Sequence, residues 1–444
     1  SDMIRHGEWI TPSINGDPWF EKPILVYWLG IPSVQLFGEV IGPRLPGVLC
    51  LWATAFVLFK FCKRWFDPAL GMVVAVAYCG SILAGFVGRQ LLADGPLALC
   101  LVLMFTTFWE SLNGRPNMRL WTAAAMGFAV LAKGPVACAF FLFVAIAAFV
   151  QFPDLRKNFK GGWLLGTLIF AAVVATWYLP CYLVNGQDFV QEFLIEQNLG
   201  RFKGGDKAHQ VPWWSHPLYF PAVLFLGLMP WSFWAVKHGW FKKPENPTLR
   251  FCWTWALVPL VFFTISLTKL PTYILPSLAP LAIIAVWTVV NNRSDGEASS
   301  TWLKRGVVAS GLVMILLNVG TRMVYEMQFL DVHQVVKQVR QYDGSVGFFR
   351  SGKSKSSTEI SLTVQESSHP SVLFYINRPA PMSDDLEEFY EMEMPVTLIS
   401  KKDRVTDEDV FDARFDGYRL DPVELEKPSA KYEVWKLDRV DPDD

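Results

Sequence analysis

Residues 120–151 read LWTAAAMGFAVLAKGPVACAFFLFVAIAAFVQ, an apolar run that is interrupted only by the sequence Lys133-Gly134-Pro135. A straight helix needs about 20 apolar residues to cross the hydrocarbon core of a bilayer. The run is therefore too long for one crossing and short for two, and we place a soft break at Lys133. Only 18% of the 444 residues are charged, against about 25% in soluble domains. The sequence predicts a multispanning α-helical membrane protein.

Similar apolar stretches recur along the chain with short connections between them. We predict about ten spans, at 46–61, 69–87, 95–112, 120–133, 135–151, 163–182, 217–236, 250–267, 272–290 and 304–320. Every second connection is basic, namely 60–64, 113–119, 154–160, 237–243 and 291–305. Because basic connections stay in the cytoplasm, this alternation predicts that the remaining connections lie on the opposite side.

The chain divides into three predicted regions. Residues 1–45 form an outer loop, within which the short apolar segment 23–39 is expected to be a helix in the membrane interface. Residues 46–322 form the transmembrane domain, and residues 323–444 form a small α/β domain outside the membrane on the outer side.

The C-terminal region differs from the rest in charge and pattern. Residues 323–444 contain 25 Asp and Glu against 15 Lys and Arg, which leaves 16 acids and 25 bases of the totals of 41 and 40 for residues 1–322. This acidic balance argues against nucleic-acid binding. We predict a helix at 331–342 and strands at 345–349, 371–375, 396–400 and 432–437. All seven cysteines lie before this region, so it is expected to fold without disulfides.

Charged residues at membrane depth are costly and mark functional sites. Four such sites on the predicted outer side adjoin a Pro or Gly that breaks a helix: Glu21-Lys22-Pro23, Asp94-Gly95-Pro96, Lys133-Gly134-Pro135 and Lys269-Leu270-Pro271. Several cations at one interface suit a phosphate, and an acid among them suits a general base. The sequence has no Walker or dinucleotide motif, so the phosphate is expected to belong to a lipid.

Each of these residues also has a structural interpretation. Lys22 and Lys269 could extend their ammonium groups to the interface, and Asp94 could pair with Arg89. Lys133 is the hardest to explain in this way, because it interrupts an otherwise apolar run. Solvation alone is a sufficient explanation for three residues of the long loop: Arg201, Lys203 and His209.

Several different short motifs occur one after another along nearly the whole chain. They are Glu8-Trp9-Ile10-Thr11-Pro12, Phe20-Glu21-Lys22-Pro23, Arg44-Leu45-Pro46, Leu131-Ala132-Lys133-Gly134-Pro135, Asn198-Leu199-Gly200-Arg201-Phe202, Pro230-Trp231-Ser232, Thr268-Lys269-Leu270-Pro271-Thr272-Tyr273 and Phe374-Tyr375-Ile376-Asn377-Arg378-Pro379. In this order they resemble the bacterial aminoarabinose transferase and dolichyl-phosphate-mannose-protein-mannosyltransferase-like family.

The resemblance implies a GT-C fold in a bacterial inner membrane, with the outer side in the periplasm. It implies transfer of a sugar from a polyprenyl-phosphate donor to a lipid A-like or protein acceptor, with no nucleotide. Glu21 and His209 then correspond to a divalent, zinc-like metal site, and Asp94 to a catalytic acid of the family. With Lys22 added from the resemblance, the donor-phosphate residues are expected to be Lys22, Lys133, Arg201 and Lys269.

One motif of the family has no counterpart here. The family's Asp-Glu pair, with its principal catalytic acid, would lie about ten residues before Asp2, by the same resemblance. We therefore expect the sequence to be a fragment that begins after its first span. Two other interpretations remain open: a transporter or flippase for a lipid-linked sugar, and a non-catalytic scaffold. The short cytoplasmic connections disfavour the transporter, since a transporter needs a path on both sides.

The first prediction concerns topology. Reporter fusions at Lys157 and at Ser345 should report opposite compartments, because the first lies in a basic connection and the second in the acidic C-terminal domain. An identical compartment for both fusions would contradict the ten-span arrangement.

Overall fold

The computed structural model describes residues 3–4, 7–14, 17–159, 161–200, 215–242, 244–291, 299–328, 330–349, 380, 382–383, 385–402, 405–426, 428–429 and 432–440. The chain forms two compact units. One is a helical unit of Trp9–Thr11 and Phe20–Leu317, and the other combines Ser1–Glu8, Pro12–Trp19 and Asn318–Asp444.

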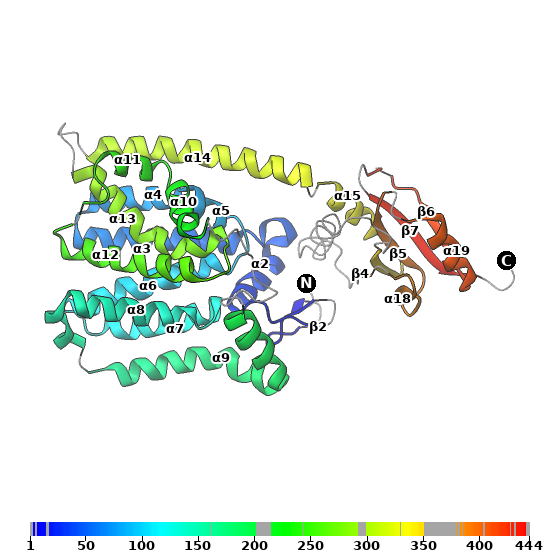
Figure 1. The fold of residues 1–444 in the computed structure, drawn as a ribbon, viewed down its shortest axis with the longest axis horizontal. Helices are drawn as coiled ribbons and strands as arrows, with labels where there is room; N and C mark the ends of the chain where they lie inside the picture. The colour runs from blue at the N-terminus through cyan, green and yellow to red at the C-terminus, as the bar shows by residue number, and fades with distance from the viewer. Residues whose placement is uncertain are drawn as a thin grey trace. The chain divides into compact units, whose positions relative to one another are not determined.

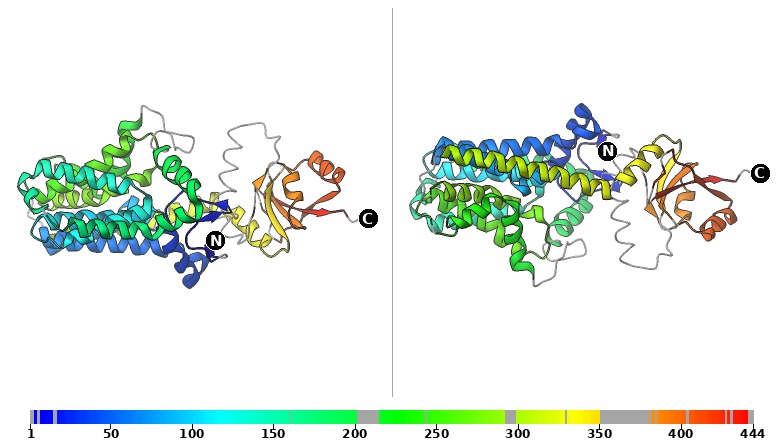
Figure 2. Two further views of the ribbon diagram at one scale, coloured as in Figure 1. Left: turned by 90° about the horizontal axis from the view of Figure 1, so that it is seen from below. Right: turned by 90° about the horizontal axis from the view of Figure 1, so that it is seen from above.

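Most of the longer helices of the first unit lie side by side along its length, whereas α2 and α10 are inclined to them (Figures 1 and 2). In chain order they are α2 Leu25–Ile41, α3 Leu45–Trp65, α4 Pro68–Cys79, α5 Ile82–Val87, α6 Asp94–Leu112, α7 Met118–Lys133, α8 Val136–Gln151, α9 Trp163–Phe189, α10 His216–Gly227, α11 Trp231–Lys237, α12 Pro247–Ile265, α13 Leu275–Asn291 and α14 Ser299–Gln328, which continues past Leu317. Shorter helical segments are η1 Pro153–Phe159, η2 Val190–Gly200 (a π-helix) and η4 Pro271–Ile274.

The ten predicted apolar ranges are largely helical, but the range 69–87 is divided between α4 and α5, and the range 217–236 between α10 and α11. Six described helices are long and apolar enough to cross a membrane, and a seventh span results if α10 and α11, which meet at 103°, are one crossing. The total of ten stays a prediction, because helices such as α7 and α8, with 16 residues each, are shorter than a typical crossing. The predicted break between them is confirmed: α7 ends at Lys133, and the next residue, Gly134, has a φ of 84° and a ψ of −167°, which are not helical.

Aromatic side chains fill the interior of the helical unit around α6. The ring of Trp109 stacks on Phe251 of α12 with centroids 4.6 Å apart, and Phe105 contacts Trp255 at 5.2 Å. All four side chains are at most 1% exposed. Packing of aromatic rings stabilises helix contacts in a membrane mainly through close van der Waals contact, so these pairs help to hold α6 against α12.

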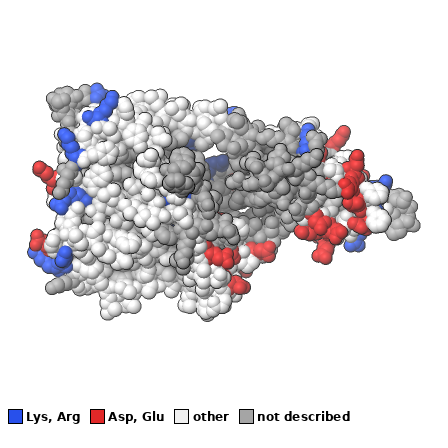
Figure 3. Space-filling model, viewed as in Figure 1, with Lys and Arg blue, Asp and Glu red and all other residues white. Residues whose placement is uncertain are grey.

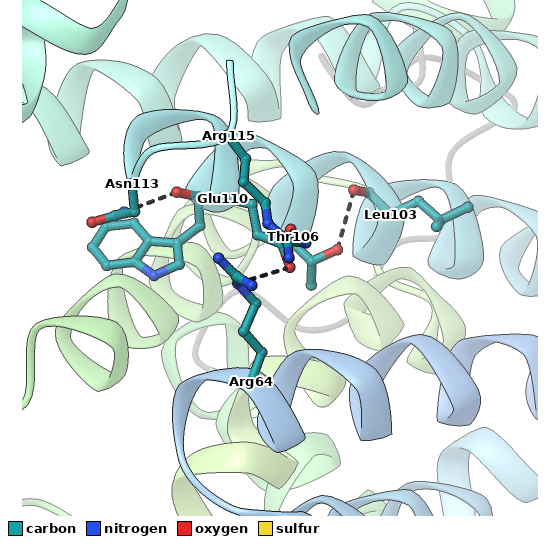
Figure 4. A network of polar contacts seen from close by, with 7 residues as sticks. Arg64, Leu103, Thr106, Glu110, Asn113 and Arg115 are labelled. Atoms are coloured by element: carbon teal, nitrogen blue, oxygen red, sulfur yellow. Dashed lines mark hydrogen bonds and ion pairs between the residues drawn. The ribbon is translucent and has the colours of Figure 1, made fainter. Parts of the chain in front are cut away.

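Basic connections lie together at one end of the helical unit. Arg64 and Arg115 share the carboxylate of Glu110, at 3.9 and 3.1 Å (Figure 4). Arg119 donates to the carbonyl of Asn158 at 2.6 Å, which joins a third basic connection to this end. Lys and Arg side chains gather there at the surface (Figure 3). These contacts bring three of the five basic connections together at one end, and the side of the membrane on which the connections lie stays a prediction.

The second unit contains a five-stranded mixed sheet of order β4-β3-β5-β7-β6. Its strands are β3 Ser345–Phe349, β4 Met382–Ser383, β5 Val396–Lys401, β6 Tyr418–Val423 and β7 Tyr432–Arg439. Strand β5 pairs parallel with β3 and antiparallel with β7. The unit also holds a short hairpin of β1 Ser13–Ile14 and β2 Asp17–Pro18.

Helices pack on both faces of this sheet. Helix α15, Leu330–Val339, buries Val335, Val336 and Val339 on one face. Helices α18, Glu387–Tyr390, and α19, Asp407–Phe415, cover the other. The predicted helix at 331–342 and three of the predicted strands are confirmed, and the strand predicted at 371–375 lies outside the described residues.

Candidate functional site

Asp94 and Lys133 form a buried ion pair at one end of the helical unit. Asp94 is the first residue of α6 and Lys133 the last residue of α7. Each charge is at the helix end that its sign stabilises, since a helix N-terminus favours anions and a C-terminus favours cations. The Lys133 ammonium donates to Asp94 Oδ1, and the two side chains are only 12% and 10% exposed.

The alternative pairing of Asp94 with Arg89 is not what the structure has. The Arg89 guanidinium donates instead to the carbonyl oxygen of Met314 on α14, at 3.3 Å. Asp94 therefore takes its cation from α7, which lies beside α6, and not from its own neighbourhood in the sequence.

An aromatic residue completes the surroundings of Lys133. The ammonium lies 4.1 Å from the centroid of the Tyr273 ring, a cation–π arrangement. Tyr273 belongs to η4, directly after the Lys269-Leu270-Pro271 break. We did not single it out from the sequence, although it stands in one of the motifs. The signal that finds it is its place two residues after a helix-breaking Pro271.

Lys269 is buried in a different way. It is 2% exposed, and its ammonium donates to the carbonyls of Phe263 at 2.8 Å, Thr264 at 2.9 Å and Ser266. The carbonyls of Phe263 and Thr264 belong to the last turn of α12, which ends at Ile265, and Ser266 is the residue that follows the helix. The last carbonyls of a helix receive no hydrogen bond from an N–H group within the helix. Lys269 supplies donors to them and so caps α12. This bonding favours a structural role over phosphate binding.

The predicted pair Glu21-Lys22 is at the entrance to α2. Lys22 Nζ lies 3.0 Å from Glu21 Oε1, and both side chains are about one-third exposed (30% and 31%). Burial raises the pKa of the Tyr27 phenol, and the nearby Glu21 carboxylate raises that pKa further. The acid of this pair therefore bonds to an ammonium and acts on a phenol through its charge.

The remaining predicted residues, Arg201, Lys203 and His209, lie outside the described residues. The described part of the chain contains no group of three or more His, Cys, Asp or Glu side chains that could hold a metal ion. Glu21 without His209 does not make a metal site, so the described residues do not by themselves fit the predicted metal.

Comparisons with known proteins place these features in a family. Residues 21–179 match the family described as dolichyl-phosphate-mannose-protein mannosyltransferase. The undecaprenyl phosphate-alpha-4-amino-4-deoxy-L-arabinose arabinosyl transferase of Shewanella sediminis is 30% identical over 73% of this chain and 60% of its own length. The protein of the same name from Pseudomonas paraeruginosa is 30% identical over 71% of this chain and 58% of its own length. The chain thus spans about three-fifths of the length of these relatives.

A solved structure has the same fold. The crystal structure of ArnT from Cupriavidus metallidurans bound to undecaprenyl phosphate superposes with a TM-score of 0.72 at 17% identity, covering 98% of this chain and 91% of that one. The apo structure of the same protein gives a TM-score of 0.73. The fold is therefore ArnT-like, of the GT-C type expected from the sequence.

The buried ion pair yields a prediction of stability. Asp94→Leu alone or Lys133→Met alone should lower the free energy of unfolding by about 3–5 kcal/mol, because each leaves a buried charge without its partner. The double variant should recover most of this loss. The loss in the single variants and its recovery in the double variant are measured by thermal unfolding of the full chain in detergent.

The exposed pair of Arg115 and Glu110 is the control. Arg115 is 47% exposed, so Arg115→Met should cost less than about 1 kcal/mol. Single variants at the buried pair that unfold at the wild-type temperature would contradict the prediction.

Proposed function

The chain belongs, over residues 21–179, to the dolichyl-phosphate-mannose-protein mannosyltransferase family, and we propose that it is an integral membrane glycosyltransferase. It transfers a sugar from a polyprenyl-phosphate donor to a lipid A-like or protein acceptor. The observation that carries this proposal is the buried pair of Asp94 and Lys133, a carboxylate and an ammonium held together at helix breaks in a chain of this family.

The donor class is supported from two directions. The relatives in Shewanella and Pseudomonas are named as transferases that use an undecaprenyl phosphate-linked aminosugar. The similarly folded ArnT was crystallised with undecaprenyl phosphate. In this chain, the Lys22 and Lys133 ammonium groups belong to segments that precede Pro23 and Pro135, and ammonium groups form strong charge-assisted hydrogen bonds to phosphate.

The proposed reaction is a displacement with inversion at the sugar. The Asp94 carboxylate takes the proton of the acceptor hydroxyl as a general base. The acceptor oxygen forms a bond to C1 of the sugar, and the bond from C1 to the phosphate oxygen breaks. The leaving polyprenyl phosphate is stabilised by Lys133 and by two residues nearer the surface or in the long loop, Lys22 and Arg201. Lys269 contributes by capping α12 and placing η4, and with it Tyr273.

The proposed location is a bacterial inner membrane with the C-terminal domain in the periplasm. Orientation follows from the basic connections that gather at one end of the helical unit, since such connections remain cytoplasmic. The Asp94 and Lys133 pair is at the other ends of α6 and α7 from those connections, so the chemistry takes place on the periplasmic side.

A divalent metal held by Glu21 and His209 is a separate proposal. A mixed oxygen and nitrogen ligand set suits a zinc-like ion, and two protein ligands require phosphate or water to complete the shell. The purified full chain should bind a divalent ion, and His209→Ala should lower the metal content measured by mass spectrometry. Equal metal content in both proteins would remove His209 from the site.

Activity is tested by sugar transfer from radiolabelled polyprenyl-phosphate sugars in proteoliposomes. The wild-type protein should release sugar from the donor. Lys133→Ala should reduce turnover by about ten- to a hundredfold, because a charge-assisted hydrogen bond contributes roughly 1.5–3 kcal/mol. Arg201→Lys should also lose activity if its guanidinium binds the phosphate with two hydrogen bonds.

The control is Lys237→Ala. Lys237 also lies over an aromatic ring, 4.3 Å from the centroid of Phe233, but among the basic connections at the opposite end. It should keep wild-type turnover. Turnover of Lys133→Ala within about twofold of wild type would exclude Lys133 from the reaction.

A further inference from the structure

The segment Trp9-Ile10-Thr11 is held by three different side chains, one for each residue. Trp28 Nε1 of α2 donates to the carbonyl of Trp9 at 2.9 Å. Trp177 Nε1 of α9 donates to the carbonyl of Ile10 at 2.7 Å. Asn185 Nδ2, also of α9, donates to Thr11 Oγ1 at 2.8 Å. The segment belongs to a sequence motif for which the proposed reaction gives no role.

A second contact fixes the chain again just before Glu21 and Lys22. The ring of Phe20 is 1% exposed and meets Phe189 edge to face, with centroids 5.4 Å apart. Phe189 in turn contacts Trp177 at 5.3 Å and stacks on Phe193 at 5.4 Å. The C-terminal part of α9 and the start of η2 thus form one aromatic cluster around Phe20.

A kink in α9 makes both contacts available from a single helix. Gly186, directly after Asn185, has φ 57° and ψ −131°, and α9 continues beyond it to Phe189. This backbone conformation favours glycine, because a side chain there is strained. The kink redirects the chain so that Phe189 packs against the ring of Trp177. Trp177 therefore contributes to both anchors, through its N–H to Ile10 and through its ring to the cluster.

We propose that the C-terminal end of α9 is a latch that positions the Glu21-Lys22 pair for the donor phosphate, with Trp177 and Asn185 as positioning residues. This inference rests on the proposed function. The two anchors, at residues 9–11 and at Phe20, lie on the N-terminal side of the pair, and α2 begins at Leu25 on its other side. Because the chain is fixed on both sides of the pair, Glu21 and Lys22 are held in place for the proposed donor phosphate.

The latch also connects two parts of the proposed site. Helix α9 is followed by η2, which ends at Gly200, and the next residue in the sequence is Arg201. The aromatic cluster that holds Phe20 includes Phe193 of η2. One cluster therefore anchors the segment before Lys22 and the start of η2.

A matched pair of substitutions tests this. Trp177→Phe removes the N–H donated to Ile10 and keeps an aromatic ring. Trp255→Phe makes the same change at an equally buried site, since both residues are 0% exposed, but no described residue accepts a hydrogen bond from Trp255 Nε1. Asn185→Ala removes the bond to Thr11 and leaves the aromatic cluster intact.

Two measurements on the full chain in proteoliposomes or nanodiscs decide the outcome. In Trp177→Phe and Asn185→Ala, kcat should fall about three- to tenfold, the effect of one hydrogen bond, while KM changes by less than about twofold, since positioning acts on the transition state. Hydrogen exchange of the peptide covering residues 7–22 should become faster in both variants. Trp255→Phe should show neither change.

The double variant Trp177→Phe/Asn185→Ala should lose little more than either single variant, because both release the same segment and their effects are not additive. The same kcat and the same exchange in Trp177→Phe and Trp255→Phe would overturn the latch. If the wild-type protein transfers no sugar from any polyprenyl-phosphate donor, the proposed function fails. The hydrogen-exchange comparison then still decides whether α9 holds the segment.

Discussion

A charge buried at membrane depth needs a partner, and the pair of Asp94 and Lys133 meets this requirement between two helix ends. Removing an ion from water costs several kcal/mol even after relaxation of the protein, so α6 and α7 can end where they do only if these ends meet. The break itself comes from Gly134, whose backbone is not helical, and from Pro135, which disfavours a helical residue before it, and it leaves Lys133 at the end of α7 beside Asp94. The ion pair thus joins the beginning of α6 to the end of α7.

Lys133 and Lys269 show two solutions to the same electrostatic problem. The ammonium of Lys269 is satisfied by three carbonyls at the end of α12, acceptors that belong to the backbone. The ammonium of Lys133 is satisfied by a carboxylate and by the face of Tyr273, both of which are side chains that can change rotamer. The difference separates a structural lysine from one that is available for chemistry, although both looked alike beside a proline in the sequence.

The hydrophobic pattern predicted where most helices lie, but it missed the breaks that divide the range 69–87 into α4 and α5 and the range 217–236 into α10 and α11. It predicted the strands near Ser345, Val396 and Tyr432 in the C-terminal domain as well. Local pattern failed where the signal was short and polar: α19 begins with a capping box of Thr406 and Asp409, and β6 contains Pro422. Sequence proximity was also a poor guide to the ion-pair partner of Asp94, for another reason. Asp94 pairs with a residue 39 positions away instead of nearby Arg89, and such pairing is set by helix packing.

The contrast between the two lysines bears on how a phosphate could enter the site. An ammonium bound to backbone carbonyls cannot turn to a ligand without leaving the end of α12 unsatisfied, and a buried group without an acceptor is costly. In the pair of Asp94 and Lys133, a phosphate oxygen can replace the carboxylate as the acceptor of Lys133, which frees the carboxylate to accept a proton. Under the proposed function, donor binding at Lys133 and activation of Asp94 as a base are therefore one event, driven by exchange of one anion for another.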